Sequence, residues 1–251
     1  MTLRDQLLGR RVLVTGYNGA IANANEDVGD GSQIYGAATT GALPSTAVRL
    51  DISSGSANDA LAGTGAQKVR VIGLDANFAP QIEEVSMNGQ TAVITAYKYL
   101  RVLGVEVIQV GSGLGNAGII YAADEACTQT AGVPSDLTKC YAWVAVGVNR
   151  SRHAIYTVPK GQRMALQSLS IANRAQICDY WVMWTPVVGT QMYTQGPLYT
   201  LAAGAQMLDS WRENLILTFP EKTDIRIWAK AATTGAIGCA SMELVGVTTG
   251  Q

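Results

Sequence analysis

Charged residues are scarce in this chain. Only 15% of its 251 residues are Asp, Glu, Lys or Arg, and the formal net charge is −1. A protein that binds nucleic acid through its phosphates presents a surplus of Lys and Arg on one face. The composition therefore predicts no nucleic-acid partner.

Clusters of histidine and cysteine are also missing. The chain has one histidine, His153, and four cysteines without a CxxC pair. Zinc sites need clustered thiolates and imidazoles, so we expect no metal. We interpret the cysteines as small buried hydrophobic residues, with a disulfide as the lesser alternative. They are Cys127, Cys140, Cys178 and Cys239.

Long hydrophobic runs are absent as well. Gly, Thr, Gln or a charged residue interrupts every apolar stretch before it nears the roughly 20 residues that a membrane helix needs. The N-terminus, MTLRDQLLGRR, has Asp5 and three arginines where a signal peptide has its apolar segment. We expect a soluble protein, made in the cytoplasm, without a membrane partner.

One stretch looks like the start of a dinucleotide-binding enzyme. Residues 10–24, RRVLVTGYNGAIANA, place Gly16, Gly19 and Ala22 close to the TGxxGxxG/A turn of short-chain dehydrogenases. That turn holds a pyrophosphate only where it opens a helix. The residues that follow contain four glycines and a proline without helical apolar spacing. We therefore predict that no cofactor binds there.

Other catalytic patterns fail in the same way. Tyr156 and Lys160 have the Tyr-x-x-x-Lys spacing of the dehydrogenases, but Pro159 between them would break the helix that must carry both. The chain has no GxSxG, HExxH or phosphate-loop motif. The sequence thus predicts a protein that is not an enzyme.

Adjacent carboxylates occur twice. Glu83 and Glu84 form one pair, and Asp124 and Glu125 form the other. Neighbours in a strand point to opposite faces, so neither pair converges on a substrate. We interpret both pairs as solvated edge charges.

What the sequence does have is a β pattern. From about residue 67 onward, short runs rich in Val, Ile, Tyr, Trp and Thr alternate with Gly, Pro, Asn and Asp, which is typical of an all-β sandwich or barrel. Strands are predicted over residues 68–76, 99–110, 117–123, 141–148, 154–159, 163–172, 177–188, 213–220, 223–231 and 240–247.

The sequence also predicts the conformation of two segments that connect strands. Residues 83–95 are expected to form a hairpin with Asn88-Gly89 at its tip, because a type I′ turn needs positive φ at both central residues. Residues 124–140 are expected to be a long exposed loop.

The first 60 residues have a different composition. They are dense in Gly, Ala, Ser, Thr and Asn, so we expect an extended N-terminal arm over residues 1–60 and a jelly-roll-like antiparallel β-sandwich over residues 61–251. Two packed sub-sandwiches that divide near residue 150 are an open alternative. The arm would gain order by lying across a neighbouring protein. Its expected anchors are Leu13, Ile34, Tyr35 and Leu43.

Aromatic residues gather in the second half of the chain. All five tryptophans lie between residues 143 and 228, and DYWVMWTP carries three aromatics in five residues. Core packing is the simpler interpretation. A subunit interface or carbohydrate platform is the other. Its candidate residues are Trp181, Trp184, Trp211 and Trp228.

Several segments are familiar in combination. SANDALAGTGAQKVRVIGLDANFAPQIEEVSMNGQTAV (residues 56–93) and YLRVLGVEVIQVGSGLGNAGII (residues 99–120) are followed by IYTVPKGQRMALQSL (155–169) and FPEKTDIRI (219–227). In this order the segments resemble a family of virion structural proteins of tailed bacteriophages, many from aquatic hosts. Lys160 and Gln162 depart from the usual VPAGK turn of that family, which should alter the turn and keep the fold.

The resemblance implies a particle component without enzymatic activity or cofactor, a capsid or tail protein. The leading hypothesis is a head decoration or cement protein that binds the major capsid protein or other virion proteins, forms a homo-oligomer, with a trimer favoured, and resides in the virion. A tail or fibre-attachment component and a carbohydrate- or receptor-binding module are the alternatives.

Overall fold

The protein is all-β in the part of the chain that the computed structural model describes. The described residues are 12–13, 21–22, 43–151, 155–175, 177–185, 193–194, 199–210, 217–231 and 237–248. Strands account for every regular element there except one short 3₁₀ helix, η1 (Leu137–Lys139). The predicted fold class is confirmed.

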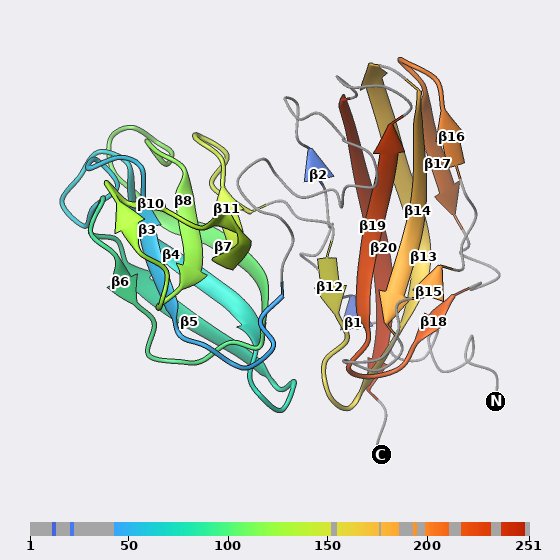
Figure 1. The fold of residues 1–251 in the computed structure, drawn as a ribbon, viewed down its shortest axis with the longest axis horizontal. Coiled ribbons are helices and arrows are strands. Elements are labelled where there is room, and N and C mark those ends of the chain that lie inside the picture. The colour runs from blue at the N-terminus through green and yellow to red at the C-terminus, as the bar shows by residue number, and fades with distance from the viewer. Residues whose placement is uncertain are drawn as a thin grey trace. The chain divides into compact units, whose positions relative to one another are not determined.

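The chain forms two compact units. One spans Ala38–Arg152, and the other combines Met1–Ala37 with His153–Gln251. Both are built from antiparallel sheets (Figure 1). We call them the N-terminal sandwich and the C-terminal sandwich.

The N-terminal sandwich has two main sheets. One has the order β5-β4-β7, and the other has the order β11-β8-β3-β6. The strands of the first are β4 (Ala66–Leu74), β5 (Pro80–Ser86) and β7 (Arg101–Val110). Those of the second are β3 (Leu50–Ser54), β6 (Val93–Ile94), β8 (Ile120–Asp124) and β11 (Cys140–Val144).

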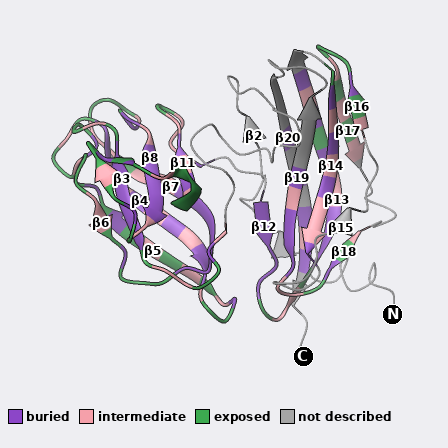
Figure 2. Ribbon diagram, in the orientation of Figure 1, coloured by how far each residue is buried: buried purple, intermediate pink, exposed green. Residues whose placement is uncertain are grey.

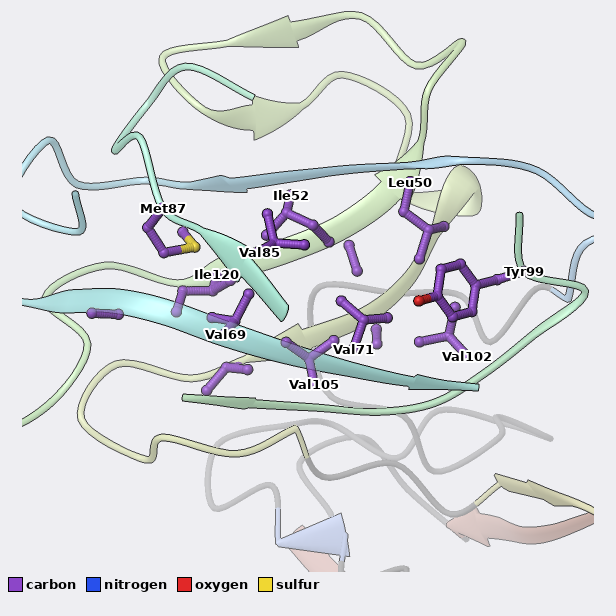
Figure 3. Packing of buried hydrophobic residues seen from close by; sticks show 14 residues of the cluster. Leu50, Ile52, Val69, Val71, Val85, Met87, Tyr99, Val102, Val105 and Ile120 are labelled. Carbon is purple, nitrogen blue, oxygen red and sulfur yellow. The ribbon is translucent and has the colours of Figure 1, made fainter. Parts of the chain in front are cut away.

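Alternate side chains from both sheets form the core between them. In β4, Val69 and Val71 are fully buried, whereas Arg70 between them is partly exposed. This is the period of two that half-buried strands impose, and Figure 2 shows buried residues along these strands. The core also takes Leu50 and Ile52 from the opposite sheet (Figure 3).

The predicted hairpin over residues 83–95 is wrong. β5 pairs with β4, and β6 pairs with β3 in the other sheet, so the Asn88-Gly89 turn connects two sheets. Gly89 has the expected positive φ of 62°, and the Thr91 amide donates to the Asn88 carbonyl at 3.1 Å. The positive φ of Gly89 was predicted correctly, but Asn88 lacks the positive φ that a type I′ turn centred on Asn88-Gly89 requires. Burial between the sheets decides which strands pair.

The expected exposed loop over residues 124–140 is partly structured. It contains the short hairpin of β9 (Gln129–Thr130) and β10 (Val133–Pro134), followed by η1. Cys127 and Pro134 are buried. Cys127 packs with Tyr121 and Cys140 in a small second core.

The C-terminal sandwich also has two sheets. The larger has the order β1-β20-β13-β17, with β18 on β13 and β2 on β20, and the smaller has the order β12-β19-β14-β15, with β16 on β14. The larger contains β1 (Val12–Leu13), β2 (Ile21–Ala22), β13 (Gln162–Ala175), β17 (Gln206–Ser210), β18 (Thr218–Phe219) and β20 (Ile237–Thr248). The smaller contains β12 (Ile155–Thr157), β14 (Cys178–Thr185), β15 (Tyr193–Thr194), β16 (Tyr199–Leu201) and β19 (Asp224–Ala231).

Its two sheets face each other across buried side chains. Leu169 and Ile171 of β13 are buried in one sheet, and Tyr180 and Val182 of β14 in the other. Trp184 of β14 meets Phe219 of β18 edge to face, with ring centroids 5.5 Å apart. This aromatic contact therefore joins the two sheets.

Part of the range expected to be an extended arm, residues 1–60, belongs to the sheets. β3 lies in the middle of a sheet, and all five of its residues are buried. β1 and β2 pair with β20 of the same chain. Other residues before Leu43 lie outside the described part of the chain.

Candidate functional site

The N-terminal sandwich contains a fully buried carboxylate, that of Asp59. Its Oδ1 accepts hydrogen bonds from the backbone amides of Ala66 at 2.6 Å and Ala117 at 2.8 Å. Its Oδ2 accepts from the Ser54 hydroxyl at 2.6 Å and from the Gly118 amide at 2.8 Å. We call these five residues the Asp59 site.

These bonds satisfy both carboxylate oxygens. A buried carboxylate is costly unless it is hydrogen-bonded or paired with a cation. Here three backbone amides and one hydroxyl perform that role. The carboxylate holds loops together, and this geometry is that of a structural residue.

The backbone around Asp59 adds a third segment to the site. The Gly89 amide donates to the Asp59 carbonyl at 2.6 Å, and the Leu61 amide donates to the Met87 carbonyl at 3.0 Å. Ala60 and Asn88 form an isolated β-bridge. The turn after β5 is therefore fixed against the loop that carries Asp59.

Two glycines are required by this close packing. A Cβ atom on Gly63 would lie 2.1 Å from the Asn58 carbonyl oxygen, and one on Gly65 would lie 2.1 Å from Oδ1 of Asp59. Side chains do not fit at such distances, so the GTG sequence of residues 63–65 is a consequence of the Asp59 site.

The C-terminal sandwich has a comparable contact between the end of β12 and the start of β19. The Thr157 hydroxyl donates to Oδ1 of Asp224, at 2.5 Å, and both residues are buried. Next to them, the Val158 amide donates to the Thr223 carbonyl at 2.9 Å, and the Lys222 amide donates to the Val158 carbonyl at 2.8 Å. We call this the Thr157–Asp224 contact.

The segments that carry the family resemblance meet at these two places. Those within residues 56–93 and 99–120 supply the Asp59 site and its supporting turn. Those within residues 155–169 and 219–227 form the Thr157–Asp224 contact. The sequence interpretation did not single out Asp59 or Asp224. The available signal was an Asp in two of the quoted segments, Asp59 within residues 56–93 and Asp224 within residues 219–227.

The candidate tryptophans are only partly described. Trp181 is partly buried on β14 and is the register partner of Trp228 on β19. Tyr180 and Val182 are buried, so the side chains of β14 alternate between two faces as expected. The face that carries Trp181 is only partly buried, whereas a strand covered on both sides would have both faces buried. Trp184 has the core contact given above. Trp211 lies outside the described residues.

The expected arm anchors are spread over different parts of the chain. Leu13 lies in β1, opposite Val245 of the same chain. Leu43 is partly buried and precedes Pro44, whose carbonyl accepts a hydrogen bond from Arg101 at 3.0 Å. Ile34 and Tyr35 lie outside the described residues. Nothing in the described geometry brings these anchors together.

The enzyme-like patterns do not have the geometry of the enzymes. Ile21 and Ala22, where the dinucleotide fingerprint needs a helix, form an antiparallel strand with β20. Tyr156 is buried in β12, and Lys160 is exposed in the turn that follows. The two residues therefore do not share a helix face.

One of the two carboxylate pairs differs clearly from its prediction as solvated edge charges. Glu83 accepts hydrogen bonds from the Ala96 amide at 2.7 Å and the Tyr97 amide at 3.1 Å, which holds the segment after β6 against β5. Glu84 forms an exposed ion pair with Arg70 at 3.1 Å. Glu83 is thus a structural residue that the sequence pattern did not reveal.

The second pair is also bonded within the sandwich. Asp124 accepts from the Ala126 amide at 2.9 Å and from the Tyr141 hydroxyl at 3.1 Å. Glu125 pairs with Arg49 at 2.9 Å.

Among the described residues, Cys127, Cys140 and Cys178 are buried free thiols, as expected. Burial raises the pKa of Cys140 to about 12. No cluster of His, Cys, Asp and Glu that could hold a metal ion is found in the described ranges. None of the helices in those ranges has the length and apolar character of a membrane span.

Asp51 is the carboxylate with the least favourable surroundings. It is 8% exposed on β3, and its Oδ1 has no hydrogen-bond partner within the described part of the chain. Its Oδ2 has a single long bond, 3.4 Å, from the Gln129 amide group. Burial, and then the charges of Glu125 and Asp124, raise the pKa of Asp51.

We predict that Asp59→Ala destabilises the N-terminal sandwich by about 3 kcal/mol or more, because each buried donor left unpaired costs on the order of 1–3 kcal/mol. Denaturant unfolding measures this loss. Faster hydrogen exchange at the amides of Ala66, Ala117 and Gly118 would locate it.

Asp136→Asn is the control for this substitution. Asp136 caps η1 by accepting from the Thr138 amide, and Asn caps a helix about as well as Asp. Its stability should stay within about 0.5 kcal/mol of the wild type. A similarly small effect for Asp59→Ala would contradict the central role of Asp59.

We further predict that Asp51→Asn stabilises the protein at neutral pH. The gain in the free energy of unfolding should be small and should raise Tm by a few degrees. The raised pKa means that the folded state binds the proton more tightly, so wild-type stability falls as the pH rises through that pKa.

The gain should therefore appear above the ordinary carboxyl pKa of 3.8 and vanish in acid. Thermal unfolding at several pH values tests this. Asp75→Asn, at a carboxylate that accepts hydrogen bonds from the Asn77 and Ala79 amides, should bring no such gain. A lower Tm for Asp51→Asn at neutral pH would refute the interpretation.

Comparisons with known proteins leave the chain unassigned. No protein-family model matches it, and no curated protein matches it. A chain in the structure of infectious bursal disease virus, Gx strain, matches with a TM-score of 0.22 and 11% identity, over 81% of this chain and 56% of that chain. This chain thus spans about half the length of the viral chain. So low a score carries no argument about fold or function.

Proposed function

We propose that this protein is a non-enzymatic structural component of a virion, and specifically a head decoration or cement protein. The observation that carries the proposal is the meeting of the resembling segments at the Asp59 site and the Thr157–Asp224 contact. Segments that hold one another in place are determinants of a fold. A resemblance built on them is more specific than a set of unrelated hairpins.

The chemistry of the described sites agrees with a structural role. The carboxylates of Asp59 and Glu83 accept hydrogen bonds from backbone amides. Such bonds hold loops in one geometry and suit a protein that presents a fixed surface to a neighbour.

A decoration protein stabilises a shell by burying surface against it. Each Å² of apolar surface removed from water contributes roughly 25 cal/mol, and many symmetric copies multiply the effect. We assign attachment to the N-terminal segment, residues 1–42, which is rich in small residues. The proposed partner is the major capsid protein or another virion protein, and the proposed oligomer is a homo-oligomer.

Copy number in purified virions tests the proposal. Quantitative mass spectrometry of density-purified particles should find hundreds of copies of a decoration protein, whereas a tail or fibre-attachment protein is present in about a dozen. The major capsid protein of the same particles serves as the internal standard. A chain absent from the particles would overturn the virion role altogether.

Truncation tests the attachment segment. We expect a chain without residues 1–42 to keep a folded N-terminal sandwich, because Val48 is bonded to Tyr99 and the described contacts of that sandwich begin after residue 42. The truncated chain also lacks β1 and β2, which pair with β20, so circular dichroism and thermal unfolding must first show that its C-terminal sandwich is folded. The folded truncated chain should not co-sediment with particles that bind the full chain. Full attachment of a folded truncated chain would refute the role of the segment.

A further inference from the structure

One end of the N-terminal sandwich is nearly free of charge. The loops over residues 55–65, 87–92, 111–119 and 145–149 meet there through the Asp59 site and through the hydrogen bonds of Asn116. Their only ionisable acidic or basic side chain is that of Asp59, which is fully buried and hydrogen-bonded. We call this surface the uncharged loop end.

Large aliphatic side chains stand exposed on this surface. Leu61 is 54% exposed, Leu114 is 80% exposed and Val146 is 56% exposed. Their loops are joined by backbone bonds, since the Gly113 amide donates to the Thr64 carbonyl at 2.7 Å and the Gly147 amide donates to the Asn116 carbonyl at 3.0 Å. Exposed aliphatic residues held on fixed loops favour an interaction surface.

Leu114 is the most informative of the three. Its φ is 60°, in the left-handed region where Gly and Asn are tolerated and Leu is strained. Its carbonyl accepts from the Asn149 side chain at 3.4 Å, and its amide donates to the Gly111 carbonyl at 3.1 Å. Backbone strain and an exposed apolar side chain both oppose folding. A leucine at this position therefore needs a reason other than the stability of the monomer.

We propose that the uncharged loop end is a contact surface for a second copy of this chain, with Leu114 as its main apolar contact. The charge distribution selects this occupant. In a contact between two copies related by a two-fold axis, residues near the axis meet their own counterparts, so ionised groups at the centre of the contact repel each other. The loop end avoids that penalty.

The other faces of the sandwich carry ionised groups. Arg70, Glu84 and Glu106 lie on the sheet that contains β4, β5 and β7, and Arg49 and Glu125 form an exposed pair beside β3 and β8. Self-contact through those faces would have to match opposite charges in register. The uncharged loop end has no such requirement.

The contact deepens the homo-oligomer part of the proposed function, on which it rests. Three aliphatic side chains on loop tips offer less than the roughly 800 Å² per partner of a typical stable interface. Self-association in solution should therefore be weak, and many copies held side by side on a particle would strengthen it.

Sedimentation equilibrium of the full-length protein over a wide concentration range tests the inference. Wild type should self-associate, and Leu114→Asn should weaken that association by about tenfold, as loss of a central contact residue does. Because Asn tolerates the left-handed region, the Tm of this variant should be unchanged or higher.

Leu208→Asn is the matched control. Leu208 is 72% exposed on β17 of the C-terminal sandwich, so its replacement removes a similar apolar surface elsewhere and should leave self-association unchanged. Equal loss of association in both variants would overturn the proposal.

Three other results would also overturn it. They are a wild type that stays monomeric at every concentration, a Leu114→Asn variant that associates like wild type, and a clearly lower Tm for that variant, which would make Leu114 a folding residue. None of them bears on copy number in virions, so failure of this inference and failure of the virion role are distinguishable.

Discussion

The buried carboxylate of Asp59 is the constraint on which the N-terminal sandwich depends. A charge removed from water must be met by donors, and no cation is paired with this one among the described ion pairs. The donors are amides of Ala66, Ala117 and Gly118, the last two nearly sixty positions away along the chain. The loops that carry these residues are therefore joined to one another.

The C-terminal sandwich uses a related arrangement. Asp224 accepts from the Thr157 hydroxyl as Asp59 accepts from the Ser54 hydroxyl. In each case a buried Asp connects a segment to another that is distant in sequence. The turns before β13 and before β19 lead from one sheet to the other, so a bond between these turns fixes how the two sheets are connected.

Polar side chains and exposed apolar side chains have different roles in this protein. Side chains that could react with a substrate, such as Glu83, are occupied in holding backbone segments. Leu114 has the opposite character, because its side chain is 80% exposed and its backbone has a φ of 60°. Loops joined by hydrogen bonds and carrying an exposed leucine agree with the proposed contact between two copies of the chain.

The sequence by itself determined where most strands lie. Alternation of apolar and polar residues is a local property, so β4 and β19 fall within about two residues of their predicted bounds. It also determined that Gly89 sits in a turn, because positive φ is a local requirement. β3 was missed because it stands among small residues that lack the large apolar side chains of a typical strand.

Only the tertiary structure decided which strands pair and which polar residues matter. The turn at Gly89 leads from one sheet to the other, because the two sides of a core must come from different sheets. In the sequence, Asp59 resembles any loop aspartate. Only the fold places the amides of Ala117 and Gly118 within hydrogen-bond distance of its carboxylate. Hydrogen bonds between residues far apart along the chain leave no local pattern, and this is the physical reason why the central residue of the site could not be identified from the sequence alone.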